Sequence, residues 1–210
     1  MKTGDLIAAL AADIRPAGVP LSRKLVLTVL AGAALAMAGF WAELGLRSDI
    51  REAMTTWRFN AKLAIVAIAM LLAVVECARL CRPTAKASIL PMLVTAILLG
   101  IAVLVELVSA PSASWGVRLL GSNAVLCLTA IPLLATAPFI ALFYAMRSGA
   151  PSAPVATGAM AGFASATLGA SLYALHCPDD SPLFVMTWYG IAILLVTAIG
   201  ALLGWKLLRW

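Results

Sequence analysis

The sequence has few charged residues and a single histidine. Charged side chains make up 11% of the 210 residues and hydrophobic ones 63%, against roughly a quarter and a half in an average soluble domain. This composition argues against a globule that faces water on all sides. No carboxylate, lysine or histidine lies at the centre of an apolar run. The sequence therefore also lacks the buried charge expected of a proton-coupled transporter or pump.

Apolar runs long enough to cross a bilayer, about 17 to 25 residues each, recur along the chain. The sequence predicts an all-α integral membrane bundle of six transmembrane helices over residues 24–210, after an N-terminal segment at residues 1–23. The first run is too long for the apolar part of a cleaved signal peptide. The six runs are Lys24–Leu44, Lys62–Leu80, Ser88–Val108, Ala124–Tyr144, Val155–Leu175 and Phe184–Leu203.

Basic residues in the short loops predict the orientation, because lysine and arginine concentrate on the cytoplasmic side. If the N-terminus is inside, ten of the 15 basic residues lie in the cytoplasm and five outside. We therefore expect both termini to be cytoplasmic. The outer group is Arg47, Arg51, Arg58, Lys62 and Arg118.

The segment before the first run, MKTGDLIAALAADIRP, is typical of a short amphipathic helix. Thr3 is a plausible N-cap, Asp5 and Arg15 complement the two helix ends, and Pro16 discourages continuation. One apolar stripe runs along it, formed by Leu6, Ile7, Leu10 and Ile14. A helix this short needs a surface to lie on. The pattern alone leaves two choices open, a membrane-surface anchor and a partner-binding peptide that folds as it docks.

The first outer loop, RSDIREAMTTWRFNAK, is expected to form an interfacial helix followed by an aromatic belt at Trp57 and Phe59. Its arginines are expected to meet lipid headgroups. Three acids, Glu43, Glu76 and Glu106, fall near span ends, where they can reach water or a base such as Arg79.

Prolines and glycines in the later runs predict how the helices bend and pack. Pro132 and Pro138 are expected to kink the fourth span, because each removes a backbone donor. Two pairs at GxxxG spacing predict close helix contacts in the fifth and sixth spans. They are Gly158 with Gly162 and Gly200 with Gly204.

The four cysteines fall into two pairs. Cys77 and Cys81 are four residues apart on the cytoplasmic side and are interpreted as packing residues. The fourth and fifth spans are predicted to form an antiparallel hairpin, in which Cys127 and Cys177 lie roughly 30 and 34 Å from the connecting loop. Both thiols should therefore reach the same height on the outer side, where a reversible disulfide can form.

His176 precedes Cys177 in the segment HCPDD, and three interpretations stay open. An imidazolium would lower the thiol pKa. A neutral imidazole could join Cys127, Cys177 and Asp179 or Asp180 in holding a soft divalent metal. The segment could equally be a polar turn at the interface. No general base or oxyanion feature accompanies the thiols, so catalysis is not expected.

Several segments together resemble the NrsF family of six-span membrane anti-sigma factors. They are MKTGDLIAALAADIRP, GLRSDIREAMTTWRFNAK, Cys127 and YALHCPDDSPLFVMTWYG. HCPDDSPxFxxxWYG is the most specific part and MKTxDLI the next. Where the family usually has an acid after MKT, this chain has Gly4.

The resemblance implies a non-enzymatic regulator in the bacterial inner membrane. It implies that the protein holds an extracytoplasmic-function sigma factor at the cytoplasmic face and releases it on oxidative or heavy-metal stress. It assigns sensing to Cys127 and Cys177, and no function to Cys77 and Cys81. His176, beside Cys177, is expected as a modulator from its chemistry alone. It makes the N-terminal segment a sigma-binding helix, and implies no cofactor and no direct contact with nucleic acid. The residues of that helix are Thr3, Asp5, Leu6, Ile7, Leu10 and Ile14.

Two other classes of function remain as alternatives. A membrane thiol oxidoreductase that passes electrons between periplasmic thiols and quinone would need a second reactive pair on the same side, which the sequence lacks. A small-solute channel or transporter is disfavoured by the absence of buried charge.

Overall fold

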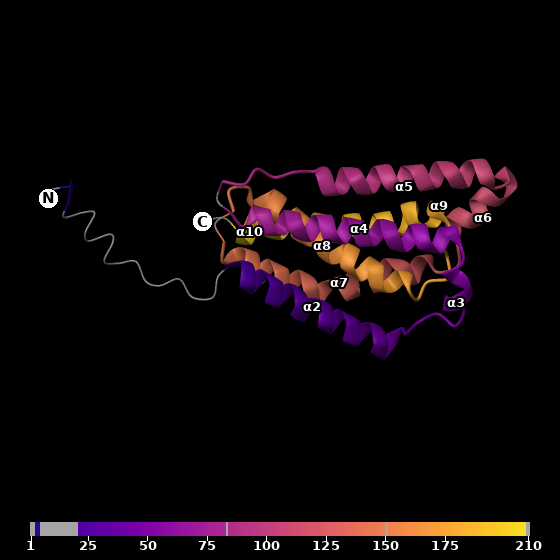
Figure 1. Ribbon diagram of the computed structural model, residues 1–210, viewed down its shortest axis with the longest axis horizontal. Coiled ribbons are helices and arrows are strands. Elements are labelled where there is room, and N and C mark those ends of the chain that lie inside the picture. The colour runs from indigo at the N-terminus through magenta and orange to yellow at the C-terminus, as the bar shows by residue number, and fades with distance from the viewer. Residues whose placement is uncertain (1–2, 5–20, 83, 150, 209–210) are drawn as a thin grey trace.

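The computed structural model describes residues 3–4, 21–82, 84–149 and 151–208, and over these residues it contains helices and no strand. Figure 1 shows an elongated bundle. Its long helices are α2 (Leu21–Glu43), α4 (Trp57–Leu80), α5 (Leu90–Ser109), α7 (Ala124–Arg147), α8 (Pro154–Ala174) and α10 (Gly190–Leu207). The short ones are α3 (Ile50–Ala53), η1 (Ser112–Ser114), α6 (Trp115–Leu120), α9 (Pro182–Phe184) and the π turn η2 (Val185–Tyr189).

Among the residues that the structure describes, six helices are long and apolar enough to cross a membrane, which confirms the predicted all-α fold. The α4 span and the last span begin earlier than predicted. α4 starts at Trp57 because the hydroxyl of Thr56 accepts a hydrogen bond from the Phe59 backbone N–H, as an N-cap does. The last span starts at Pro182, since α9, η2 and α10 follow one another without a break.

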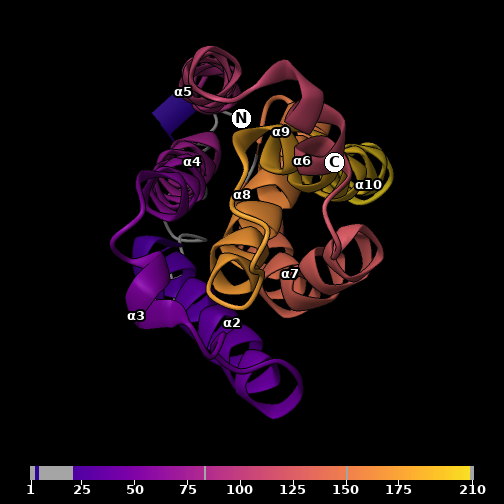
Figure 2. The ribbon, with the colours of Figure 1, turned by 90° about the vertical axis from the view of Figure 1, so that its right-hand side faces the viewer.

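α8 occupies the centre of the bundle. Figure 2 looks along the bundle and shows α8 surrounded by α2, α4, α7 and α10, all of which contact it. In the most apolar stretch of α8, 78% of the residues are buried inside the bundle. In the corresponding stretch of α5, only 17% are buried. α8 is rich in glycine, alanine and serine, and small side chains allow neighbouring helices to approach on every side.

The glycine pairs form the contact between α8 and α10. Their spacing predicted close packing but not which helices meet. A Cβ atom added at Gly158 would lie 2.2 Å from the carbonyl oxygen of Gly200, and one added at Gly204 would lie 2.3 Å from that of Pro154. These separations are too short for any side chain. The contact between the two helices is therefore backbone against backbone.

The first outer loop differs from the sequence prediction. Trp57 is exposed, but Phe59 is fully buried, so Phe59 is not part of a lipid-facing belt. Two of the loop's arginines bind carboxylates of the protein: Arg47 pairs with Asp49 and Asp180, and Arg58 pairs with Glu106. The expectation that these arginines meet headgroups was wrong, because burying carboxylates in an apolar bundle requires partners of opposite charge.

Other predictions for the spans have mixed outcomes. Glu76 does pair with Arg79, as expected near a span end. Glu106 is fully buried and bridges Arg58 and Arg118, with N–O distances of 2.7 Å to each. α7 continues as one helix through Pro132 and Pro138.

The start of α2 and the end of α10 lie at the same end of the bundle, as six crossings require (Figure 1). The start of α2 meets the end of α7 there, where Lys24 donates a hydrogen bond to Ser148. α3, α6 and α9 lie at the opposite end (Figure 1), and the segment between α8 and α9 lies with them.

Candidate functional site

The structure brings Cys127 and Cys177 together at the α3 end of the bundle. Cys127 lies on the first turn of α7, and Cys177 lies in the loop between α8 and α9. Both are fully buried in one hydrophobic cluster, and their sulfurs are close enough to interact electrostatically. Both are free thiols.

Asp179 positions the Cys177 loop against α7. Its Oδ2 accepts hydrogen bonds from the backbone N–H groups of Ser122 and Asn123, at 3.0 and 2.9 Å, and from the Asn123 side chain at 3.0 Å. N–H groups at the start of a helix have no partner within the helix, so a carboxylate there is stabilising. Gly121, with φ of +56°, turns the chain just before this contact. Cys177, two residues before Asp179, is thereby held beside Cys127.

Two buried tyrosines enclose the thiols. Tyr173 and Tyr189 are 0% and 1% exposed, and their ring centroids are 5.7 Å apart. Neither hydroxyl has a hydrogen-bond partner in the part of the chain that the structure describes. Burial raises the pKa of the Cys177 thiol, and the positive charge of Lys62 opposes this effect. The thiol is therefore protonated and shielded at neutral pH.

Asp180, Arg47 and Lys62 form what we call the ionic latch. Arg47 Nη1 lies 2.8 Å from Asp180 Oδ2, and Lys62 Nζ lies 2.5 Å from Asp180 Oδ1. The two cations also donate to the carbonyl oxygen of Cys177, at 3.2 and 2.9 Å. Lys62 is only 2% exposed. Burying its charge is tolerated because Asp180 and this carbonyl oxygen satisfy it.

The latch ties the thiol loop to the end of α2. Arg47 donates its backbone N–H to the carbonyl oxygen of Leu175 at 3.2 Å, and His176 Nδ1 lies 3.1 Å from the carbonyl oxygen of Gly45. Arg47 also makes a two-pronged pair with Asp49, which lowers the pKa of the exposed Asp49 carboxyl to about 2. Hydrogen bonds and an ion pair therefore join the Cys177 loop to the segment that leaves α2.

The donors considered for a metal are engaged elsewhere. His176 faces Gly45, Asp179 binds the start of α7 and Asp180 belongs to the latch. Within residues 3–4, 21–82, 84–149 and 151–208, no group of three His, Cys, Asp or Glu side chains is arranged to hold a metal ion. Metal capture at Cys127, Cys177 and His176 would need the loop to rearrange first.

Some residues around the thiols could be predicted from the sequence and others could not. Sequence reasoning missed the roles of Arg47, Lys62, Tyr173 and Tyr189, since no local pattern says which distant carboxylate or sulfur a side chain will meet. The predicted packing role of Cys77 and Cys81 agrees with their burial. Of the proposed partner-binding residues, Thr3 is exposed, whereas the others lie outside the described residues. These are Asp5, Leu6, Ile7, Leu10 and Ile14.

Comparison with known proteins gives a consistent result over the whole chain. Residues 10–210 match the family NrsF, described as "Negative regulator of sigma F". The chain is 30% identical over 213 residues to the "Probable anti-sigma-F factor NrsF" of Azospira oryzae, and 29% identical over 215 residues to the "Anti-sigma-F factor NrsF" of Caulobacter vibrioides. Both alignments cover 100% of each chain. No solved structure matches.

Proposed function

Since this chain belongs to the NrsF family of negative regulators of sigma F, we propose that it is a membrane anti-sigma factor of regulatory, non-enzymatic function. Its partner is a sigma factor of the extracytoplasmic-function type, held at the cytoplasmic face of the inner membrane. Full-length similarity to two proteins named anti-sigma-F factors carries this proposal. The cytoplasmic surface must include the end of the bundle where α2 begins, because the N-terminal segment leads directly into α2.

Sensing is assigned to Cys127 and Cys177. A two-electron oxidant would take two electrons and two protons from the pair and leave one sulfur–sulfur bond. Support comes from the common buried environment of the two thiols. It also comes from their place at the start of α7 and in the loop between α8 and α9, at the end of the bundle opposite the start of α2 (Figure 1). On the proposed orientation this end faces the periplasm, where disulfides form.

The signal would pass through α2. Bond formation pulls Cys177 towards Cys127 and shifts its carbonyl oxygen, to which Arg47 and Lys62 donate. Arg47 follows α2, and α2 packs tightly on α7: a Cβ added at Gly32 would lie 2.6 Å from the Pro138 Cα. A helix packed this closely moves as a unit rather than bending. The displacement would therefore reach the first turn of α2 and the sigma-binding segment joined to it.

The experiment that tests the function is capture of the partner with matched variants. Leu10→Asp places a charge on the predicted apolar stripe, while Ala12→Asp places the same charge on the opposite face of the same helix. Tagged full-length protein is solubilised from bacterial membranes, and bound proteins are identified by mass spectrometry.

We expect wild type and Ala12→Asp to recover a sigma factor. Leu10→Asp should recover at least about tenfold less, because a carboxylate buried in an apolar interface is strongly unfavourable. If wild type recovers no sigma factor, the proposed function is wrong. If Leu10→Asp recovers as much as Ala12→Asp, the N-terminal stripe is not the contact surface.

A further inference from the structure

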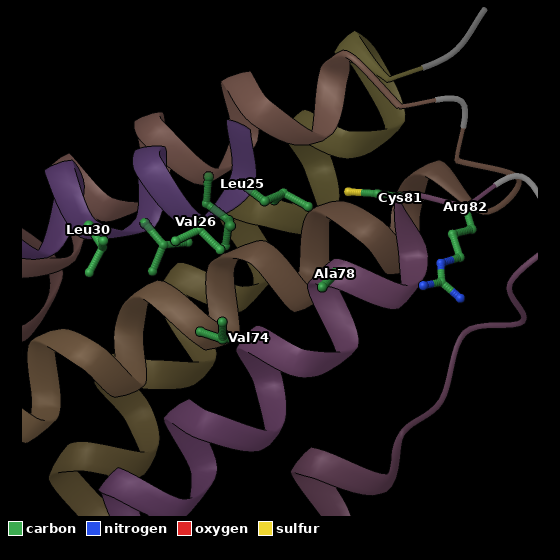
Figure 3. A pocket seen from close by; sticks show the side chains of 9 residues that line it. Leu25, Val26, Leu30, Val74, Ala78, Cys81 and Arg82 are labelled. Atoms are coloured by element: carbon green, nitrogen blue, oxygen red, sulfur yellow. The ribbon is translucent and has the colours of Figure 1, made fainter. Parts of the chain in front are cut away.

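An apolar groove lies between α2 and α4, at the end of the bundle where α2 begins. Its cavity volume is about 560 Å³, within the range of about 300 to 1,000 Å³ typical of small-molecule sites. Figure 3 shows Leu25, Val26 and Leu30 on one wall and Val74 and Ala78 on the other. Val26 and Leu30 are 58% and 61% exposed. The groove therefore opens outwards, towards the hydrocarbon that surrounds the spans.

The length of the groove suits one leaflet of a bilayer. Along α4 it extends from Arg82 to Val74, which at the helical rise is about 12 Å. The hydrocarbon core of a bilayer is about 30 Å thick. The groove therefore covers less than half the membrane, ends at one interface and cannot be a channel. Its shape fits one extended chain that enters from that interface.

A positive charge lies at the interfacial end of the groove. Arg82 follows α4, is exposed, and has no side-chain partner among the residues that the structure describes. Neighbouring cations are engaged: Lys24 binds Ser148 and Arg79 pairs with Glu76. A guanidinium at the membrane interface is suited to binding a phosphate group.

A second groove at the other end of α2 provides a comparison. It lies between α2 and α7, has a volume of about 450 Å³ and is also apolar, but its charged residue is Glu43. An acid at that position repels an anionic headgroup. The two grooves have similar size and lining, and they differ in the sign of the charge.

We propose that the groove between α2 and α4 binds an acyl chain of an anionic phospholipid whose phosphate is held by Arg82. This site goes beyond sigma-factor binding and thiol sensing. The lipid would fill the space between α2 and α4 and brace the first turns of α2. The groove between α2 and α7 would hold lipid without preference for anionic headgroups.

Lipid retention tests the proposal directly. The full-length protein is purified from membranes, exchanged into mixtures of phosphatidylglycerol and phosphatidylethanolamine, and examined by native mass spectrometry. Wild type should retain phosphatidylglycerol in preference. Arg82→Gln should lower this preference about fivefold, because one basic residue at a membrane surface strengthens the binding of anionic lipid by about this factor.

Arg147→Gln is the matched control, because Arg147 is exposed at the same end of the bundle and lines neither groove. It should retain phosphatidylglycerol as wild type does. Equal retention of the two lipids by wild type, or an equal loss in the two variants, would overturn the proposal.

Photo-crosslinking identifies what occupies the groove in the cell. With p-benzoylphenylalanine at position 78, illumination of intact membranes should attach a phospholipid to the protein. Attachment to a peptide from residues 1–20 would show that the chain's own N-terminal segment fills the groove, and attachment to a second copy would show an oligomer contact. Either of these two results would refute a lipid site, and neither would affect capture of the sigma factor.

Discussion

Single charged residues carry much of the structural information in this apolar chain. Asp180 bridges two cations and Glu106 bridges two arginines, each joining segments far apart in the sequence. A charge in a membrane bundle is unfavourable unless it is paired, and its partner must then stay in place. Each of these carboxylates therefore determines where two helices or loops lie.

Asp180→Asn should destabilise the protein, because it leaves the buried Lys62 beside Arg47 without a carboxylate partner, whereas Arg47 keeps Asp49. We expect the free energy of unfolding to fall by about 3 kcal/mol. This value is at the low end for breaking a buried ion pair, since the Asp180 side chain keeps 15% of its surface exposed. Asp49→Asn is the control, because it removes a carboxylate that also binds Arg47 but is largely exposed. Thermal unfolding in detergent should show a clear drop in Tm for the first variant and little change for the second. Similar Tm values would argue against the latch.

Cys127→Ser and Cys177→Ser should leave the sigma factor bound but prevent its release by oxidant. The physical reason is that a lone thiol cannot form the bond that displaces Cys177. The measurement is the amount of sigma factor recovered with the tagged protein before and after oxidant treatment. Cys77→Ala is the control, because Cys77 is a buried thiol in a different helix, α4. This variant should respond like wild type. Normal release from both serine variants would disprove the thiol mechanism.

Among the helices, α8 and α10 make the closest pair. Their glycines allow backbone contact, so packing there depends on the absence of side chains. The same residue type has no such role in α5, where a Cβ at Gly100 would meet nothing within 4 Å.

Gly158→Ala should therefore destabilise the bundle, and Gly100→Ala should not. Overpacking of a tight contact costs typically about 1 to 3 kcal/mol, whereas alanine in place of a free helical glycine is favourable by up to about 1 kcal/mol. Unfolding of the two purified variants in a denaturant series measures the difference. A neutral Gly158→Ala would mean that the helices can separate without loss.

The elements were largely predictable from the sequence, whereas their partners were not. Apolar run length predicted all six spans. GxxxG spacing predicted that the fifth and sixth spans each have a close packing surface, but not that Gly158 meets Gly200. Phe59 was assigned to lipid because an aromatic residue near a span end resembles a belt, but only tertiary packing decides that it faces inward. Arg47 and Lys62 were counted as outer charges, because their distant partner Asp180 is invisible in local sequence.

The two ends of the bundle carry different features. One end holds both thiols and the ionic latch, and the other holds the lipid groove and the start of α2. The proposed function requires that these ends face opposite sides of the membrane.

Fusions to reporter proteins test this orientation. Green fluorescent protein joined after Trp210 should fluoresce, because the C-terminus is expected in the cytoplasm, where the bases of the short loops concentrate. Alkaline phosphatase inserted at Ser112, in the exposed turn before α6, should be active in the periplasm. The reverse pattern would place the thiols in the reducing compartment and refute the sensing scheme.

The central position of α8 governs the order in which the protein can be built. Helices enter the membrane as the ribosome makes them, yet α8 is the fifth of the six spans. The inward faces of the four earlier helices therefore stay unpacked until α8 is inserted. A chain that stopped after Arg147 would have four of the outer helices but not the central helix α8. The bundle can therefore be completed only near the end of translation, and any restraint on transcription can begin only then.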